Sequence, residues 1–512
     1  MIRRTAAAAG STVAAAVSFL AACSSAPPPA TPAPLDLLAV TLDSVLGSPP
    51  LDRTHWGIAV LDQRTGATLH AHNADRHFIP ASNTKLVVTA VALGLLGPNW
   101  RYETPIYAAT RPDSVAQQLV IAARGDPTWS RRFYDSGLAP LDTVAAMVRA
   151  AGIRRIEDLV IDATWFDDQP VHPTWEISDL PYSYAPPVDA FAIDEATFRL
   201  VVSPGDSPGE PARVMALAPA GQQVIAAIET DTAGARTSIN ADYMLRADKV
   251  FLDGRIAFDE VDTLTLAVTS PAHFAALALR DMFERAGIPV TGAVRVVRDS
   301  LEAARLRPVI GDFAAALALQ PDAPRAFREI GRVRSPTLDS VVAGILRPSQ
   351  NWIAEQLLKM LGATYGGEGT WSAGIDVERR FLIDRAAIDS TAFYLRDASG
   401  LSVQNLLTPA ATVRLLEFVR AQPWAGVYAD ALPSPGMDES TLENRLEPLA
   451  DRLRAKTGTI THVNSMAGFL TTVDGRDLTF SIMTNASGVP SAAVRRGIDR
   501  IVQALAASRS ES

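Results

Sequence analysis

Residues 80–94 read Pro80-Ala81-Ser82-Asn83-Thr84-Lys85-Leu86-Val87-Val88-Thr89-Ala90-Val91-Ala92-Leu93-Gly94. A proline at the start and a glycine at the end are typical of the two ends of a helix. Nearly every side chain after Lys85 is apolar, so we expect the helix to be buried. Ser82 and Lys85 are three residues apart and should therefore lie on one helical face.

Strands near both ends of the chain are predicted to form one sheet. Their patterns cover residues 56–61, 67–72, 452–456, 465–473 and 477–484. The dipeptide Asp474-Gly475 is a strong hairpin signal, and 494–505 has helical periodicity. We predict an α+β fold: an antiparallel sheet closed by both ends of the chain, flanked by helices, with a large inserted β-rich region.

The composition of the 512 residues is that of a globular protein, with 48% apolar and 20% charged residues. The net charge of −9 gives no support for binding nucleic acid. A single cysteine, Cys23, excludes an internal disulfide or a multi-cysteine metal site. Lysine is scarce in the sequence, so each lysine is a candidate for a role that arginine could not fill. The lysines are Lys85, Lys249, Lys359 and Lys456.

Residues 1–22 have the pattern of a signal peptide, with two arginines before an uncharged, alanine-rich run. Cys23 after that run resembles the lipobox of bacterial lipoproteins, in which the cysteine carries a lipid; the alternative is an ordinary signal peptide with an incidental cysteine. Residues 23–35 would then be a lipidated, proline-rich tether. Ser24, by the same resemblance, suggests outer-membrane sorting. We expect an exported protein, lipid-anchored in the bacterial envelope at the periplasmic face of the outer membrane.

The pair Ser82 and Lys85 suits nucleophilic chemistry. A serine hydroxyl becomes a good nucleophile when a neighbour takes its proton. Burial lowers the pKa of a lysine, so its amine can accept that proton. Ser349 and Asn351 precede a helix that starts near residue 352; Ser349 could relay a proton, and Asn351 could donate to a substrate carbonyl. Alone, each motif also fits an ordinary polar first turn of a helix.

A third motif, Lys456-Thr457-Gly458 followed by Thr459, is predicted at the end of a strand. Lys456 and Thr457 could bind a carboxylate, and the Thr459 N–H could face an oxyanion. Gly458 would let a backbone or a substrate approach closely. Alone, this motif equally fits an edge-strand lysine with a bulge glycine.

The order Ser-x-x-Lys, Ser-x-Asn, Lys-Thr-Gly resembles the penicillin-recognising serine enzymes. The large insertion between the first two motifs resembles the DacB-type D-alanyl-D-alanine carboxypeptidases of peptidase family S13. Further stretches also look like that family: Gly125-Asp126-Pro127, Leu180-Pro181-Tyr182-Ser183-Tyr184-Ala185, Ala354-Glu355 and Asp397-Ala398-Ser399-Gly400-Leu401-Ser402. The departures from its pattern are Gln350, Ala398 and His462, where the family commonly has Asp, Gly and Gly.

The resemblance implies a β-lactamase/transpeptidase-like catalytic domain over 36–103 and 301–512, with 104–300 inserted as two nested domains. It implies a serine D-alanyl-D-alanine carboxypeptidase or endopeptidase that acts on peptidoglycan stem peptides, uses neither metal nor cofactor, and is acylated by β-lactams. The residues that would carry the reaction are Ser82 (nucleophile), Lys85 (base), Ser349 and Asn351 (proton shuttle and substrate), Lys456 and Thr457 (carboxylate), Gly458 beside them, and the N–H groups of Ser82 and Thr459 (oxyanion hole).

Three alternative functions fit the sequence less well. A β-lactamase of class A would need a Glu-x-x-Leu-Asn loop, but Glu447 stands where Asn is needed after Glu443, only shortly before Lys456. A non-catalytic wall-binding protein of the same fold would not need Ser82 and Lys85. The presence of both residues therefore argues against this alternative. Metal chemistry would rest on His70 and His72, which share one strand face without an acidic cluster.

Overall fold

The computed structural model describes residues 37–111, 113–135, 139–217, 223–244, 249–307 and 327–509. The predicted signal peptide and tether, with Cys23, lie outside the described residues. Within the described ranges, none of the helices has both the length and the apolar character needed to cross a membrane.

A five-stranded antiparallel sheet joins the two ends of the chain in the order β16-β17-β18-β1-β2. Strand β1 runs beside β18 with His55 opposite Asn485, as the predicted sheet requires. The Asp474-Gly475 hairpin joins β17 to β18, as predicted. The strands are β1 (His55–Asp62), β2 (Thr68–His72), β16 (Leu453–Ile460), β17 (Val463–Thr471) and β18 (Asp477–Asn485).

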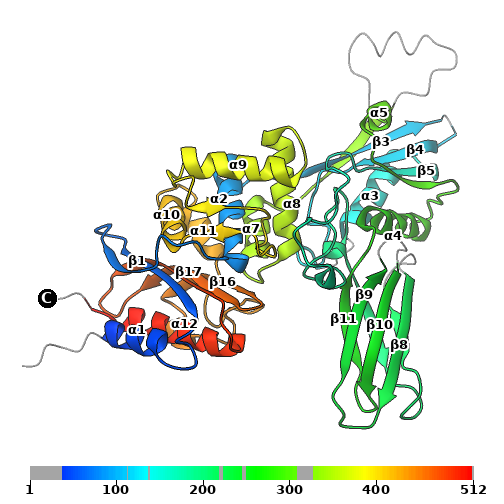
Figure 1. The fold of residues 1–512 in the computed structure, drawn as a ribbon. Coiled ribbons are helices and arrows are strands. Elements are labelled where there is room, and N and C mark those ends of the chain that lie inside the picture. Colours follow the sequence, from blue (N-terminus) through cyan, green and yellow to red (C-terminus); the bar gives the residue numbers. More distant parts are fainter. Residues whose placement is uncertain are drawn as a thin grey trace, which may run out of the picture. The chain divides into compact units, whose positions relative to one another are not determined.

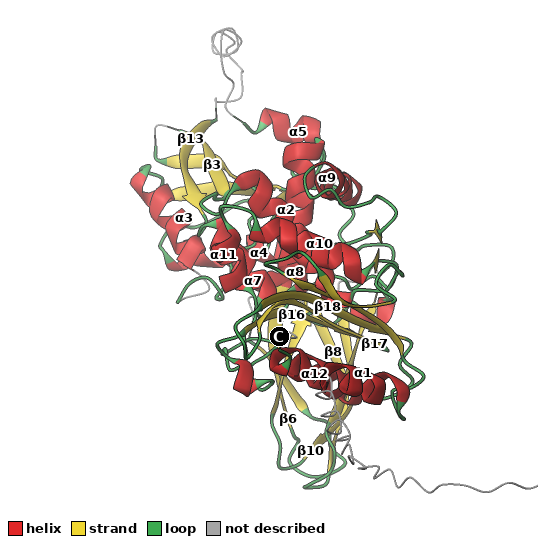
Figure 2. Ribbon diagram, turned by 90° about the vertical axis from the view of Figure 1, so that its left-hand side faces the viewer, coloured by secondary structure: helices red, strands yellow, loops and turns green. Residues whose placement is uncertain are grey.

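Helices cover both faces of this sheet. On one face, α1 (Leu37–Gly47) and α12 (Ser491–Ala507) lie side by side (Figures 1 and 2). Trp56, Phe480 and Ile498 belong to the apolar cluster between that pair and the strands. On the other face lie α2 (Lys85–Leu96), α7 (Leu338–Leu346), α8 (Asn351–Leu361), α9 (Trp371–Asp384), α10 (Pro409–Arg420) and α11 (Ala425–Ala431) (Figure 1).

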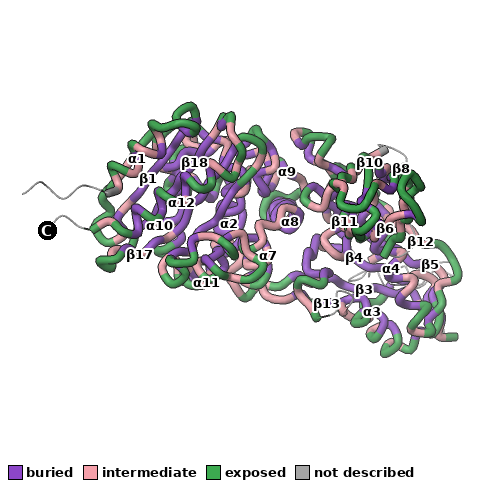
Figure 3. The backbone as a smooth tube through the Cα atoms, turned by 90° about the horizontal axis from the view of Figure 1, so that it is seen from below, coloured by how far each residue is buried: buried purple, intermediate pink, exposed green. Residues whose placement is uncertain are grey.

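Helix α2 is buried almost all round, as its sequence predicts, with every residue from Lys85 to Leu93 inaccessible to solvent (Figure 3). The turn before it differs from the prediction. Residues Ala81–Thr84 form a 3₁₀ turn, and the α-helix proper begins at Lys85. Tight 3₁₀ turns are common at helix N-termini.

The middle of the chain contains further sheets. A mixed five-stranded sheet has the order β12-β5-β4-β3-β13, and two three-stranded sheets have the orders β11-β6-β7 and β8-β10-β9. The strands are β3 (Glu103–Thr110), β4 (Val115–Ala122), β5 (Arg155–Asp162), β6 (Thr197–Ser203), β7 (Arg213–Ala216), β8 (Gln223–Asp231), β9 (Ser238–Met244), β10 (Lys249–Ala257), β11 (Asp262–Ala267), β12 (Val294–Val297) and β13 (Arg328–Arg334). The helices are α3 (Ala139–Ala150), α4 (Pro271–Arg285) and α5 (Ser300–Arg305).

Strand β13 bears on the expected end of the insertion. It lies beyond residue 300, where the insertion was expected to end, yet it pairs antiparallel with β3. Its pairing with a strand more than 200 residues earlier leaves no local sequence signal. We therefore propose that the inserted region extends to about Arg334 rather than to 300.

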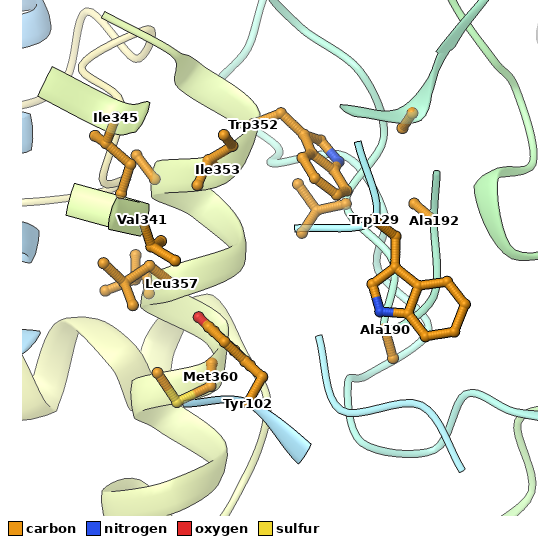
Figure 4. Close-up of a cluster of buried hydrophobic side chains, with 14 of the residues drawn as sticks. Tyr102, Trp129, Ala190, Ala192, Val341, Ile345, Trp352, Ile353, Leu357 and Met360 are labelled. Carbon is orange, nitrogen blue, oxygen red and sulfur yellow. The ribbon is translucent and has the colours of Figure 1, made fainter. Parts of the chain in front are cut away.

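One apolar cluster continues from α2, α7 and α8 into the inserted region. Trp352 projects from α8 toward Trp129 and Ala192 (Figure 4). Its indole Nε1 donates to the carbonyl oxygen of Pro187 at 3.0 Å, so this large side chain is buried without leaving its polar atom unpaired. The insertion and the helical layer thus share a core, which fixes the segments that flank the predicted site.

Candidate active site

Ser82 lies in the 3₁₀ turn at the start of α2, partly exposed, while its neighbours Asn83 and Thr84 are buried. Gly400 packs directly against this turn: a Cβ there would lie 1.9 Å from the carbonyl oxygen of Ala81, and its φ is +79°. Both the space and the left-handed backbone admit only glycine. The Asp397–Ser402 stretch is therefore pressed against the Ser82 turn.

Lys85 is wholly buried beside Ser82. Its Nζ lies 2.8 Å from Ser82 Oγ, 2.7 Å from Asn351 Oδ1 and 2.6 Å from the carbonyl oxygen of Ser399. Burial lowers the pKa of Lys85 to about 7, although the nearby carboxylates of Asp397 and Glu355 act in the opposite direction. A large fraction of molecules therefore holds a neutral amine near neutral pH.

The carbonyl of Ser399 is held in place by a buried carboxylate on α8. Glu355 accepts from the backbone N–H groups of Ser399 at 2.7 Å and Ala398 at 3.1 Å, and from Trp371 Nε1 at 2.8 Å. Burial first, and then the nearby charge of Asp397, raise the pKa of Glu355. Glu355 thus acts on Lys85 through the loop between them.

Asp397 ties the same loop together from within. It is fully buried and accepts from the N–H groups of Gly400 at 2.9 Å and Ser402 at 2.7 Å. Asn405 Nδ2 and Trp175 Nε1 donate to it at 2.7 and 2.9 Å. A carboxylate with four donors is well satisfied despite its burial, so the loop has one defined shape.

Asn351 connects Lys85 to the inserted region. Its Oδ1 accepts from Lys85, and its Nδ2 donates to the carbonyl oxygen of Tyr184 at 2.8 Å. The sequence led us to expect this side chain to contact substrate; in the structure it also orients the lysine. Ser349, just before α8, has a φ of +64°.

Lys456 lies in the middle of β16 and not at a strand end, because β16 continues to pair with β17 as far as Ile460. Its Nζ is buried and donates to Ser349 Oγ at 2.9 Å. Burial and the positive charge of Lys85 lower the pKa of Lys456 well below its ordinary value. The second and third motifs are therefore in direct contact.

Gly458 brings β16 against the nucleophile. A Cβ at this position would lie 3.0 Å from the backbone nitrogen of Ser82 and 2.9 Å from the Pro80 carbonyl oxygen. Thr457 and Thr459 flank it, and Thr457 Oγ1 donates to Thr441 Oγ1 at 2.7 Å. The strand edge and the start of α2 thus enclose a narrow space above Ser82.

A cleft of about 470 Å³ opens over these groups. Its lining is Ser82, Asp179, Tyr184, Ser349, Asn351, Leu401, Thr441, Arg445, Thr457, Thr459, Ile460, Thr461 and Arg495. Arg445 is neutralised by Asp499 at 2.6 Å. Arg495 is exposed and makes no ion pair with any described residue. No role was predicted from the sequence for either arginine, nor for Glu355 or Tyr184.

The histidines set aside as metal ligands stay apart from this cleft. His70 and His72 lie on β2, the edge strand of the five-stranded sheet. Across the described ranges, no group of three or more histidine, cysteine, aspartate or glutamate side chains is placed to hold a metal ion.

The chain is similar to known proteins along most of its length. Residues 38–309 and 313–508 match the D-Ala-D-Ala carboxypeptidase 3 (S13) family. A D-alanyl-D-alanine carboxypeptidase of Actinomadura sp. (strain R39) is 30% identical over 480 residues, which cover 90% of this chain and 83% of that protein.

Solved structures show the same fold. The crystal structure of penicillin-binding protein 4 (dacB) from Haemophilus influenzae superimposes with a TM-score of 0.77 at 20% identity, over 92% of this chain and 99% of that one. The same protein in complex with a β-lactam gives a TM-score of 0.71 at 19% identity and equal coverage. The predicted α+β fold is confirmed. Matched along nearly all of its described length, the chain belongs to the D-Ala-D-Ala carboxypeptidase 3 (S13) family.

Proposed function

We propose that the protein hydrolyses the terminal D-alanyl-D-alanine bond of peptidoglycan stem peptides through an acyl-enzyme on Ser82. The observation that carries this proposal is the buried Lys85 amine, 2.8 Å from Ser82 Oγ and with its pKa lowered to about 7. A base with a pKa near the working pH is well suited to take the serine proton.

The contacts of Lys85 also orient it as a base. A neutral amine has two N–H bonds and one lone pair. The acceptors Asn351 Oδ1 and Ser399 O, at 2.7 and 2.6 Å, take up the two N–H bonds. The lone pair is then left for the hydroxyl proton of Ser82, and the nucleophile is activated without a change of geometry.

In the first step, Ser82 Oγ bonds to the carbonyl carbon while its proton moves to Lys85. We assign the oxyanion to the backbone N–H groups of Ser82 and Thr459, which the close approach of Gly458 supports. The C–N bond then breaks, and the proton that Lys85 took from Ser82 passes through Ser349 to the leaving amine, which leaves Lys85 neutral again; Ser349 Oγ lies 2.9 Å from Lys456 Nζ. Water finally hydrolyses the ester and restores Ser82.

The terminal carboxylate of the substrate needs polar partners in the same cleft. Thr457 and Thr459 line it, while Lys456 is buried beneath and bonded to Ser349. Arg495 supplies an exposed cation at the rim that forms no ion pair within the described part of the chain. We propose that Thr457, Thr459 and Arg495 bind the carboxylate and that Lys456 contributes from below.

The H. influenzae protein binds a β-lactam, and we propose that β-lactams acylate Ser82 here. Intact mass after incubation with penicillin tests this. Wild type should gain the mass of one penicillin. Ser82→Ala should gain none, and a full adduct on that variant would overturn the assignment of the nucleophile.

The location of the enzyme is a separate proposal. Export would bring it to its substrate, and the sequence around Cys23 supports a lipid anchor facing the periplasm from the outer membrane. Labelling with radioactive palmitate should mark the wild type and leave Cys23→Ala unmarked. Equal labelling of both proteins would rule out Cys23 as the acceptor.

A further inference from the structure

The hydroxyl of Ser349 depends on a backbone conformation that needs outside support. Its φ of +64° lies in the left-handed region, which a residue other than glycine occupies only when its surroundings hold it there. Ser349 Oγ must nevertheless stay 2.9 Å from Lys456 Nζ. The source of support is the next residue, Gln350.

Gln350 uses both ends of its amide. Its Oε1 accepts from the N–H of Ile353 at 3.2 Å and so caps helix α8. Its Nε2 donates to Glu195 Oε2 at 2.5 Å. One side chain therefore fixes the loop of Ser349 to α8 on one side and to the inserted region on the other.

Glu195 is itself firmly held. Its carboxylate accepts from Arg132 through Nε at 2.5 Å and a terminal nitrogen at 3.0 Å, and from Ser130 Oγ at 3.1 Å. The side chain is only 12% exposed. Such two-point pairing of arginine with a carboxylate fixes direction as well as distance.

The backbone that carries Glu195 is strained. Asp194, Glu195 and Ala196 have φ values of 47°, 59° and 55°, three consecutive non-glycine residues in the left-handed region. Strain of this kind persists only where the surroundings over-determine it, and it gathers at functional sites. Here it directs Glu195 at the loop of the second motif.

We propose that Glu195 is a positioning residue for the Ser349 proton relay, acting through Gln350. The inference rests on the proposed role of Ser349 in protonating the leaving amine. Glu195, which belongs to the inserted region and does not line the cleft, would thereby take part in catalysis without touching the substrate.

The contact between Gln350 and Glu195 needs an amide donor facing a carboxylate acceptor, so exchanging these two groups tests the proposal. Gln350 donates to a carboxylate, so Gln350→Glu sets two carboxylates face to face while retaining the cap on α8. Steady-state release of D-alanine by Gln350→Glu should fall about tenfold in kcat, with KM changed less than about twofold. In the double variant Gln350→Glu with Glu195→Gln, an amide again faces a carboxylate, and most of the lost kcat should return.

Single variants at Glu195 complete the set. Glu195→Ala should lower kcat about tenfold, whereas Glu195→Gln keeps an acceptor and should stay within about threefold. Arg111→Ala is the matched control: Arg111 pairs through two nitrogens with the carboxylate of Glu157, in a strand of the inserted region away from the Glu195 turn. It should leave kcat unchanged.

A substrate whose leaving group needs no proton distinguishes a positioning role of Glu195 from a general weakening of the fold. A thioester substrate releases a thiolate, whose thiol has a pKa near 8.5, and needs no proton from Ser349. Glu195→Ala should therefore lose about tenfold on the peptide and less than about twofold on the thioester. Equal losses on both substrates, or no rescue in the double variant, would overturn the proposal. Acylation of these variants by penicillin at Ser82 would show that the proposed function stands regardless.

Discussion

The lowered pKa of Lys85 predicts the pH profile of acylation. Going from the ordinary 10.5 to about 7 means that the site disfavours the ammonium form by roughly 5 kcal/mol relative to water. At pH 7 about half of the molecules then hold a neutral amine, against about three in ten thousand for an ordinary lysine. Burial thus raises the population of competent base by about three powers of ten.

The sign of this shift fixes the shape of the profile. Lys85 must lose its proton to act, so the second-order rate constant of acylation by a β-lactam should rise tenfold per pH unit below about pH 6. It should bend near pH 7, where the lysine is half deprotonated, and level off above about 8. Stopped-flow mixing with a chromogenic cephalosporin between pH 5 and 9.5 measures this directly.

Lys85→Arg is the matched variant, because it keeps the positive charge but cannot accept a proton near neutral pH. Acylation should drop about a thousandfold. A wild-type rate that continues to climb past pH 9 would show an ordinary lysine pKa. A rate independent of pH, or retained in Lys85→Arg, would assign the base to another group.

Three further predictions follow from the contacts. Gly458→Ala places a methyl group 3.0 Å from the backbone nitrogen of Ser82 and should slow acylation at least about tenfold, measured by adduct mass against time. Arg495→Ala should raise KM about tenfold for a substrate with a free terminal carboxylate and have no effect on its C-terminal amide; neighbouring Arg496→Ala, which is exposed outside the cleft, should do neither. Leu357→Ala, in the core of Figure 4, should lower the free energy of unfolding by urea by about 3 kcal/mol. A loss below about 1 kcal/mol would show that neighbouring side chains fill the cavity.

The sequence predicted the parts of the fold that depend on local pattern. The alternation of apolar and polar residues and the Asp474-Gly475 turn predicted the strands that close the sheet. The continuous apolar run after Lys85 predicted the buried helix α2. The Ser82–Lys85 contact followed from a spacing of three residues, which a 3₁₀ turn and the α-helix after it both place on one side.

What the sequence missed comes from contacts between distant segments. The carbonyl of Ser399 reaches Lys85 across 314 positions of the chain, and Gln350 reaches Glu195 across 155. Neither contact produces a periodic pattern or a short motif in the sequence. Glu355 did leave a signal, since an acidic residue stands among the apolar residues of α8 and is fully buried. A buried acid in an apolar helix requires donors, and that reasoning points toward the Ser399 loop.

The register of β1 against β18 has a consequence for how the enzyme comes into being. His55 pairs with Asn485, so a strand that is made early is completed only by a strand that is made much later. The sheet that carries Lys456 cannot close until β18 is available, because β18 lies between β1 and β17. A chain in which β18 has not yet been made therefore lacks the closed sheet that sets Lys456 beside Ser349.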